Sequence, residues 1–237
     1  MNQNFESKVI IINSIFGNLL DFSSRDVFDE FKELVFSSEA EIIEEFNFNQ
    51  KKINSKYFYN ERGSILFEKI TKLDHSNQLA GKVKQEFILE KEFMQDIKWG
   101  EFLAKAIKVW LQNDSNKKLK SIDIISCWIV RQFQNEYNPI HLHSGHISGV
   151  GYLKVPKSFG KVSEKKKVND KGRLTFIHGS VNLFSKATYV IKPEGGDFYL
   201  FPNYLLHTVY PFSDTDEERR SISFNAQLDK NSASYAS

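Results

Sequence analysis

Residues 121–229 consist of short apolar runs separated by turn residues, and none of the runs has the spacing of a helix. Many short strands punctuated by regular turns are typical of a sandwich, a jelly roll or a barrel. We therefore predict a mainly β core, built from eight strands. Their sequences are SIDIISCWIV, YNPIHLH, ISGVGYLKV, RLTFIHG, ATYVIK, DFYLFP, LHTVYP and RRSISFNAQL.

The N-terminal half has a different pattern. Apolar residues recur at helical intervals over 24–38 and again over 80–113, where Trp99-Gly100 is expected to break the second segment into two helices. Residues 8–13 predict a short strand, and the polar stretch 40–78 predicts irregular structure. Helices that precede a set of strands are expected to support one face of the β core.

The length of 237 residues fits one domain. We predict a single domain over 1–237, in which 1–120 supplies an N-terminal strand and supporting helices. Residues 121–229 form the β core, and 230–237 form a flexible tail. The charged segment 160–173 is predicted to be a solvated connection, with a lid over the substrate as the alternative.

Composition excludes several classes of protein. A net charge of +2 gives no case for a nucleic-acid or membrane partner. The single cysteine, Cys127, cannot form an internal disulfide, which fits a cytoplasmic location, and its apolar surroundings predict a small core residue. The N-terminus does not have the pattern of a signal peptide.

Three histidines form the candidate metal site. His141 and His143 are two positions apart on a predicted strand and therefore project from the same face, while Leu142 turns away. His207 lies on a later strand and is the natural third ligand, because imidazole suits iron, zinc and copper. His146 and His178 compete for this role. We expect His146 to face elsewhere on a regular strand, unless a bulge at Ser144-Gly145 turns it toward the pair, and we expect His178 to be structural or to line the rim.

An arginine follows the last of these histidines by one short acidic hairpin. Arg219 and Ser221 share one face of the last predicted strand, and Arg220 occupies the other face. A buried guanidinium binds both oxygens of a carboxylate at once. We expect the hairpin to place this strand antiparallel beside the strand of His207, with Arg219 holding the carboxylate of an organic acid.

The order of these motifs resembles the double-stranded β-helix of iron(II)- and 2-oxoglutarate-dependent oxygenases, and in particular a branch found in bacteria and their phages. The resemblance covers residues 121–228 well and the N-terminal half loosely. Three segments carry it: NPIHLHSGHISGVGYLKVP, GGDFYLFPNYLLHTVYPF and ERRSISFNAQ.

This resemblance implies a fold and a chemistry. The fold is a jelly-roll (cupin-like) double-stranded β-helix after a helical region. His141 and His207 match iron ligands, Arg219 and Ser221 match the residues that bind the far carboxylate of 2-oxoglutarate, and Tyr152 is a weaker candidate for that carboxylate. The implied reaction uses iron(II), 2-oxoglutarate and O2 to hydroxylate a C–H bond of a small molecule or a peptide, with release of succinate and CO2.

His143 departs from the usual pattern of the superfamily, which has Asp or Glu at this position. Either His143 is the third ligand of an all-histidine site, or it stands beside an iron that has an open position there. Two other functions remain. One is a metal-binding jelly roll without activity, and the other is a three-histidine dioxygenase that does not use 2-oxoglutarate.

Overall fold

The structure is a computed structural model. It describes residues 36–37, 40–58, 73–78, 81–115, 120–161, 169–181 and 187–229. The predicted strand at 8–13 and the tail at 230–237 lie outside these residues, as do most of the predicted helix at 24–38 and residues 162–168 of the charged loop.

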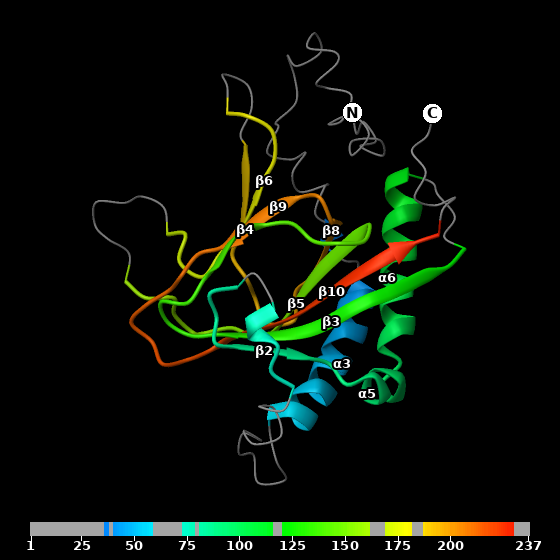
Figure 1. The fold of residues 1–237 in the computed structure, drawn as a ribbon, viewed down its shortest axis with the longest axis horizontal. Helices are drawn as coiled ribbons and strands as arrows, with labels where there is room; N and C mark the ends of the chain where they lie inside the picture. The colour runs from blue at the N-terminus through cyan, green and yellow to red at the C-terminus, as the bar shows by residue number, and fades with distance from the viewer. Residues whose placement is uncertain are drawn as a thin grey trace.

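Two antiparallel sheets form the core (Figure 1). The larger sheet has the order β1-β8-β5-β10-β3-β2 and the smaller one the order β4-β9-β6-β7. The strands of the larger sheet are β1 (Phe36–Ser37), β2 (Gln85–Ile88), β3 (Ile122–Gln132), β5 (Ile147–Lys154), β8 (Phe198–Pro202) and β10 (Arg219–Leu228). Those of the smaller sheet are β4 (Asn138–His141), β6 (Leu174–Ile177), β7 (Thr188–Ile191) and β9 (Leu206–Val209).

All eight strands predicted in the β core are present, as β3 to β10. Within β3 to β10, consecutive strands lie in different sheets, except β6 and β7, which pair with each other. This is the double-stranded β-helix, and the fold prediction is confirmed. The predicted pairing of the last two strands is wrong, because β9 lies in the smaller sheet and β10 pairs with β3 and β5 in the larger one.

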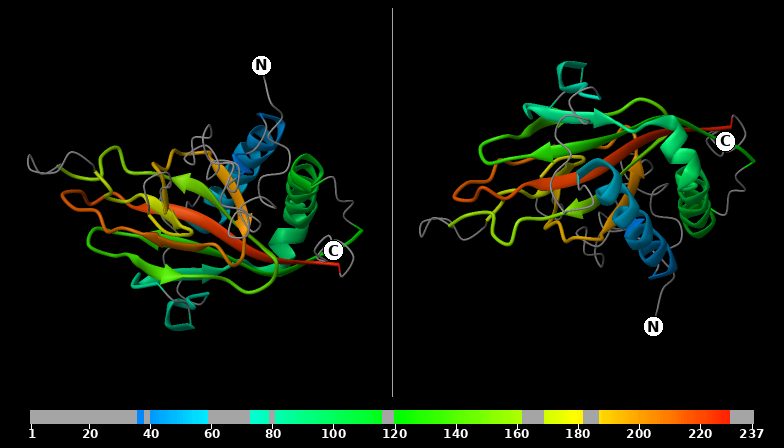
Figure 2. Two further views of the ribbon diagram at one scale, coloured as in Figure 1. Left: turned by 90° about the horizontal axis from the view of Figure 1, so that it is seen from above. Right: turned by 90° about the horizontal axis from the view of Figure 1, so that it is seen from below.

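Helices cover the outer face of the larger sheet. Helices α3 (Ala40–Phe58) and α6 (Trp99–Ser115) lie on the same side of it, with the short α5 (Lys91–Asp96) beside α6 (Figure 2). The ring of Phe46 on α3 packs on Phe198 of β8, with ring centroids 5.1 Å apart. It also occupies the space above Gly151 of β5, where a Cβ atom would lie 2.4 Å from the ring. Glycine at this position therefore allows α3 to approach the sheet closely.

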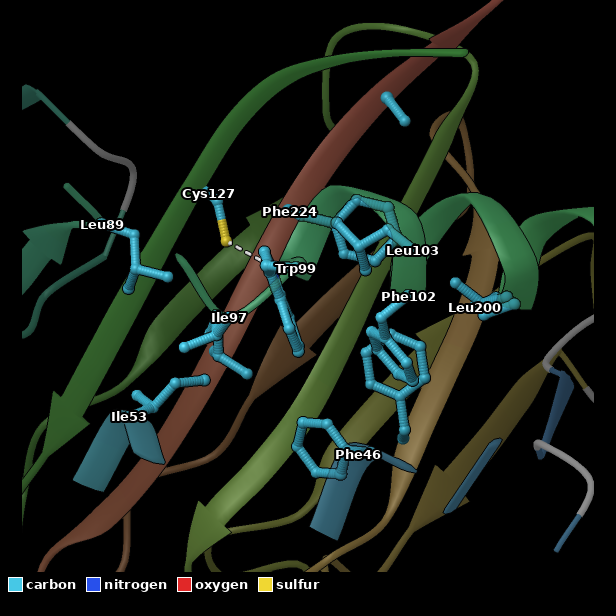
Figure 3. Close-up of a cluster of buried hydrophobic side chains, with 14 of the residues drawn as sticks. Phe46, Ile53, Leu89, Ile97, Trp99, Phe102, Leu103, Cys127, Leu200 and Phe224 are labelled. Atoms are coloured by element: carbon cyan, nitrogen blue, oxygen red, sulfur yellow. Dashed lines mark hydrogen bonds between the residues drawn. The ribbon is translucent and has the colours of Figure 1, made fainter. Parts of the chain in front are cut away.

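The main hydrophobic core lies between these helices and the sheet, and aromatic rings fill much of it (Figure 3). Cys127 on β3 is 2 % exposed and accepts a hydrogen bond from Trp99 Nε1 at 3.2 Å. Burial raises the pKa of its thiol to about 12. Cys127 is thus a protonated core residue, as its apolar sequence neighbours predicted.

Three predictions in the N-terminal half are wrong. Residues 40–58 form α3 instead of irregular structure, because the buried residues of this polar segment recur at helical spacing: Ile42, Phe46, Asn49 and Ile53. Residues 85–88 form strand β2 rather than a helix, since they pair with β3. Phe36–Ser37, at the end of the predicted helix 24–38, form strand β1.

The later helical segment is interrupted as predicted, but at a different position. Lys98 adopts a left-handed backbone conformation with φ 56° and separates α5 from α6, so Trp99 begins the second helix instead of ending the first. Among the helices in the described part of the chain, none is long and apolar enough to cross a membrane.

Candidate functional site

Three histidine side chains converge between the two sheets. His141 ends β4 and is directly opposite His207 of β9 in the strand register, while His143 lies two residues beyond the end of β4. One nitrogen from each ring lies within 4.8 Å of the other two, and Nε2 of His143 is 3.1 Å from Nε2 of His207. Leu142 between the pair is 56 % exposed. The predicted constellation is therefore assembled in the fold.

Backbone carbonyls fix the orientation of two of these rings. Nδ1 of His141 lies 2.7 Å from the carbonyl oxygen of Pro139, and Nδ1 of His207 lies 2.9 Å from that of Leu205. An Nδ1–H that donates to a carbonyl leaves Nε2 as the bare lone pair. Both rings thus present Nε2 as the ligand atom.

His143 is held through its backbone by Asn203, a residue that the sequence analysis did not single out. The N–H of His143 donates to the carbonyl oxygen of Asn203 at 3.0 Å, and Nδ2 of Asn203 donates to the carbonyl oxygen of His143 at 3.1 Å. The indole of Trp128 lies against the imidazole, with ring centroids 5.6 Å apart. These contacts fix His143 although it lies outside a strand.

The three imidazoles are neutral at physiological pH. Burial, together with the neighbouring imidazoles of His141 and His143, lowers the pKa of His207 to about 3. Burial and His141 lower the pKa of His143 to about 4, and burial lowers the pKa of His141. Neutral imidazole is the form that binds a metal ion, so no proton has to leave before binding at neutral pH.

The histidines line a cavity of about 250 Å³ between the sheets. One part of its wall is apolar and includes Trp128, Val150 and Phe201. The other part is polar and is supplied largely by β10, whose Arg219, Ser221, Ser223 and Asn225 all face the cavity. Alternate residues of a strand share a face, which is why these four side chains line up.

Arg219 is buried in this wall, with 2 % of its surface exposed. Its guanidinium donates to the Tyr152 hydroxyl at 3.3 Å and to Oε1 of Gln132 at 3.4 Å, and its Nε has no partner within the described residues. No carboxylate of the described segments forms an ion pair with it. A buried cation with a free donor is suited to an anionic ligand.

Comparison with family models identifies the β core. Residues 126–225 match the model described as "Putative 2OG-Fe(II) oxygenase", and this range contains the three histidines, Arg219 and Ser221. The β core therefore resembles the 2OG-Fe(II) oxygenase family. Iron(II) and 2-oxoglutarate are the cofactors of this family, and they agree with the three-histidine cluster in the oxygenase core.

A second model, described as a SAM-dependent histidine-specific methyltransferase, matches residues 38–77. The described residues of that range form α3 and η1 (Ser76–Gln78), outside the β core of the oxygenase. No curated protein sequence matches the chain significantly.

Solved structures of similar shape include several oxygenases. A prolyl-4-hydroxylase from Pseudomonas putida is 12 % identical, with 85 % of this chain and 96 % of that chain covered and a TM-score of 0.46. A prolyl hydroxylase from Trichoplax adhaerens, in complex with a hypoxia-inducible-factor peptide, is 10 % identical. The match covers 92 % of this chain and 99 % of that chain, with a TM-score of 0.48. HygX from Streptomyces hygroscopicus with iron bound is 10 % identical, covers 87 % of each chain, and has a TM-score of 0.49.

Arg220 has a different environment from its neighbour in the oxygenase core. It is fully buried on the helix side of β10, where it pairs with Glu218, donates to Oδ1 of Asn54 at 2.7 Å and stacks on the ring of Phe58. Glu218 also pairs with Arg131 of β3. The acidic residues of the hairpin thus include one buried ion-pair partner, which the sequence alone did not reveal.

The remaining histidines do not line the cavity of the oxygenase. Nδ1 of His146 accepts a hydrogen bond from the Leu228 N–H at 3.0 Å, and the backbone of His146 donates to the Ala226 carbonyl. His178 follows β6, with its N–H bonded to the Ala187 carbonyl, and His75 lies beside β2 outside the β core. Neither belongs to the three-histidine cluster.

The structure adds Glu86 to the cavity wall, a residue that the sequence analysis did not identify. Glu86 on β2 is 2 % exposed, and its Oε2 has no hydrogen-bond partner among the described residues. Burial, together with the negative charges of Asp74 and Glu136, raises the pKa of its carboxyl to about 7. A carboxyl group kept in this environment costs stability once it ionises.

We expect Glu86→Gln to stabilise the protein more at pH 8 than at pH 5. The folded state holds the Glu86 proton up to about pH 7, whereas the unfolded state releases it near 4.5, so stability is lost between these values as pH rises. The glutamine variant avoids this loss, which amounts to at most about 3 kcal/mol. Urea unfolding of both proteins at the two pH values measures the difference, and an equal difference at both would contradict the prediction.

Proposed function

We propose that this protein is an iron(II)- and 2-oxoglutarate-dependent dioxygenase that hydroxylates a C–H bond of a small-molecule or peptide substrate, releasing succinate and CO2. The observation that carries the proposal is a three-imidazole cluster in the same cavity as a buried arginine that has no acidic partner among the described residues. The imidazole cluster suits a redox metal, and the buried arginine suits a dicarboxylate co-substrate.

The donor set fits a metal ion. Two nitrogens in adjacent positions about 2.1 Å from one ion lie about 3 Å apart. The 3.1 Å between Nε2 of His143 and Nε2 of His207 agrees with this spacing. With the Nδ1 atoms of His141 and His207 engaged by carbonyls, His141, His143 and His207 are the proposed ligands.

The residues around the ligands have separate tasks. Arg219 would hold the far carboxylate of 2-oxoglutarate, with the Ser221 hydroxyl as a further donor on the same face of β10. The Tyr152 hydroxyl positions the guanidinium, since the two groups are 3.3 Å apart. Val150, Phe201 and other apolar wall residues exclude water from the site. Bound iron(II) with 2-oxoglutarate supplies the activation of O2 that an unreactive C–H bond requires.

The presence of His143 supports a second candidate function. Because an imidazole replaces the usual carboxylate, the cluster also suits a three-histidine dioxygenase that oxidises a directly bound substrate. In that case Arg219 would hold a carboxylate of the substrate, and no 2-oxoglutarate would be consumed.

The test is an anaerobic titration of the full chain with iron(II) and 2-oxoglutarate, followed by exposure to O2. The proposed function predicts a weak visible charge-transfer band and the formation of succinate, at least as a slow uncoupled reaction. A protein that binds iron but gives neither the band nor succinate contradicts the proposal. Oxidation of a carboxylate-bearing substrate without 2-oxoglutarate would favour the second candidate.

We expect His143→Ala to weaken iron(II) binding by about ten- to a hundredfold, because one of three neutral donors is lost. His146→Ala is the matched control, since His146 follows in the same segment and bonds to the backbone of Leu228 instead. Isothermal titration with iron(II) measures both affinities. Unchanged affinity in His143→Ala would assign His143 to a position beside the metal rather than on it.

A further inference from the structure

Two buried side-chain oxygen atoms in the cavity wall lack hydrogen-bond partners in the described part of the chain. They are Oε2 of Glu86 on β2 and Oδ1 of Asn138 on β4. Both residues line the cavity that contains the histidines, and neither belongs to the proposed iron or 2-oxoglutarate site. A buried acceptor without a hydrogen bond lowers the stability of the folded state by about 1–3 kcal/mol. A donor from a bound ligand would remove this penalty.

These two residues come from edge strands of different sheets. β2 is the edge of the larger sheet and β4 the edge of the smaller one. Between the two edges passes the segment around Gly81, which a hydrogen bond from the Lys82 N–H to the Tyr137 carbonyl fastens to the start of β4. Glu86 and Asn138 therefore form a side wall where the two sheets meet.

Gly81 leaves a gap between the two side chains. A Cβ atom on Gly81 would lie 2.6 Å from Oδ1 of Asn138 and 3.0 Å from Oε2 of Glu86, so both oxygens border the same small space. Across the larger sheet, Glu86 is opposite Val130, which in turn is opposite Ser221. The side wall is thus two strands away from the residue proposed to bind 2-oxoglutarate.

The charges around the side wall are negative. Asp74 and Glu136 act on Glu86 together with its own burial, and all three raise its pKa. The buried cation Arg131, on the neighbouring strand β3, is engaged by Glu218 and Gln85. Lys82 and Lys84 on either side of Val83 are exposed. The wall accordingly offers acceptors and negative potential to whatever enters the cavity.

We propose that this side wall is a substrate subsite that takes an ammonium group, with Glu86 as its counter-ion and Asn138 as a second acceptor. The inference rests on the proposed function, because it names the substrate class of the same cavity: a primary amine, either free or as the side chain of a lysine in a peptide. An ammonium group supplies three donors and one positive charge, which matches two unpaired acceptors and one carboxylate.

Binding is tested on the iron(II)- and 2-oxoglutarate-loaded full chain by quenching of tryptophan fluorescence, since Trp128 lines the cavity. The probes are free lysine and a capped Gly-Gly-Lys-Gly-Gly peptide, each compared with its norleucine counterpart, which lacks the ammonium group. We expect at least tenfold tighter binding of the lysine probe within one pair, and the pair that shows it distinguishes a free amine from a peptide. Equal binding of lysine and norleucine in both pairs, or no binding, overturns the proposal.

The variant Glu86→Gln keeps the size of the side chain and removes its charge. We expect it to reduce the lysine-over-norleucine preference at least tenfold. Glu92→Gln is the matched control, because it makes the same change at an exposed position of α5 that does not line the cavity, and it should change the preference less than twofold. A Glu86→Gln protein that retains the full preference overturns the assignment of Glu86.

Failure of the subsite and failure of the proposed function have different signatures. If only the subsite is wrong, the wild type forms the charge-transfer band and succinate in the absence of substrate, while the lysine preference is missing. If the function is wrong, the band and the succinate are missing in the wild type, and the fluorescence titration still reports whether the cavity selects an ammonium group.

Discussion

We expect His207→Ala to abolish the charge-transfer band and to reduce succinate formation at least about a hundredfold. The loss of a metal ligand should lower activity more than the loss of a residue that only orients a ligand. His207 is the most deeply buried of the three proposed ligands, and its Nε2 lies close to that of His143. Its loss leaves two donors, which hold a divalent ion weakly. Anaerobic iron(II) titration and a succinate assay measure the two effects.

The control for this variant is His178→Ala. His178 lies after β6 in the same sheet as His207 but does not line the cavity, so its removal should leave the band unchanged. Thermal unfolding of both variants separates a lost ligand from a lost fold. A His207→Ala protein that folds and still forms the band would remove His207 from the metal site.

The second large effect is expected for Arg219→Ala, which should raise the KM for 2-oxoglutarate about a hundredfold while changing the affinity for iron(II) little. Each hydrogen bond from a buried guanidinium to a carboxylate contributes about 1.5–3 kcal/mol, so the loss of both bonds costs at least about 3 kcal/mol, and a hundredfold is the lower end of the expected effect. Arg219→Lys should give an intermediate value, since an ammonium group keeps the charge but not the planar fork.

Arg220→Lys is the matched control for this prediction. It changes the adjacent residue, which faces the helices and pairs with Glu218. We expect it to lower the stability and to leave the KM for 2-oxoglutarate unchanged. The assignment of Arg219 is contradicted if the two variants raise this KM equally, or if Arg219→Ala weakens iron binding as strongly as 2-oxoglutarate binding.

Local sequence pattern predicted most of the β core. The eight short apolar runs form eight strands. Arg219 and Ser221 project from the same face of β10, as their spacing predicted. Strand periodicity depends only on the alternation of neighbouring residues, so it can be predicted without knowing which strands pair with each other. The same holds for His141 and His143, although only His141 lies within a strand.

Tertiary pairing decided what the local pattern could not. Residues 85–88 have a helix-like pattern but pair with β3, and β10 crosses to the larger sheet instead of lying beside β9. Both outcomes depend on contacts with strands distant in the chain, which no local period encodes. Helix α3 was not predicted for a related reason. Its composition is polar, and its few buried residues are recognised as one face only once the helix is seen packed on the sheet.

The sequence by itself therefore determined the strands of the β core, the same-face placement of Arg219 and Ser221 on β10, and the three histidines as a candidate set, since these follow from residue type and from the alternation along each strand. The tertiary structure alone decided how the strands divide between two sheets, which carbonyls orient the imidazoles, and that Glu86 and Asn138 meet beside Gly81. These features join residues from different sheet edges and loops, and their proximity is a product of the folded chain.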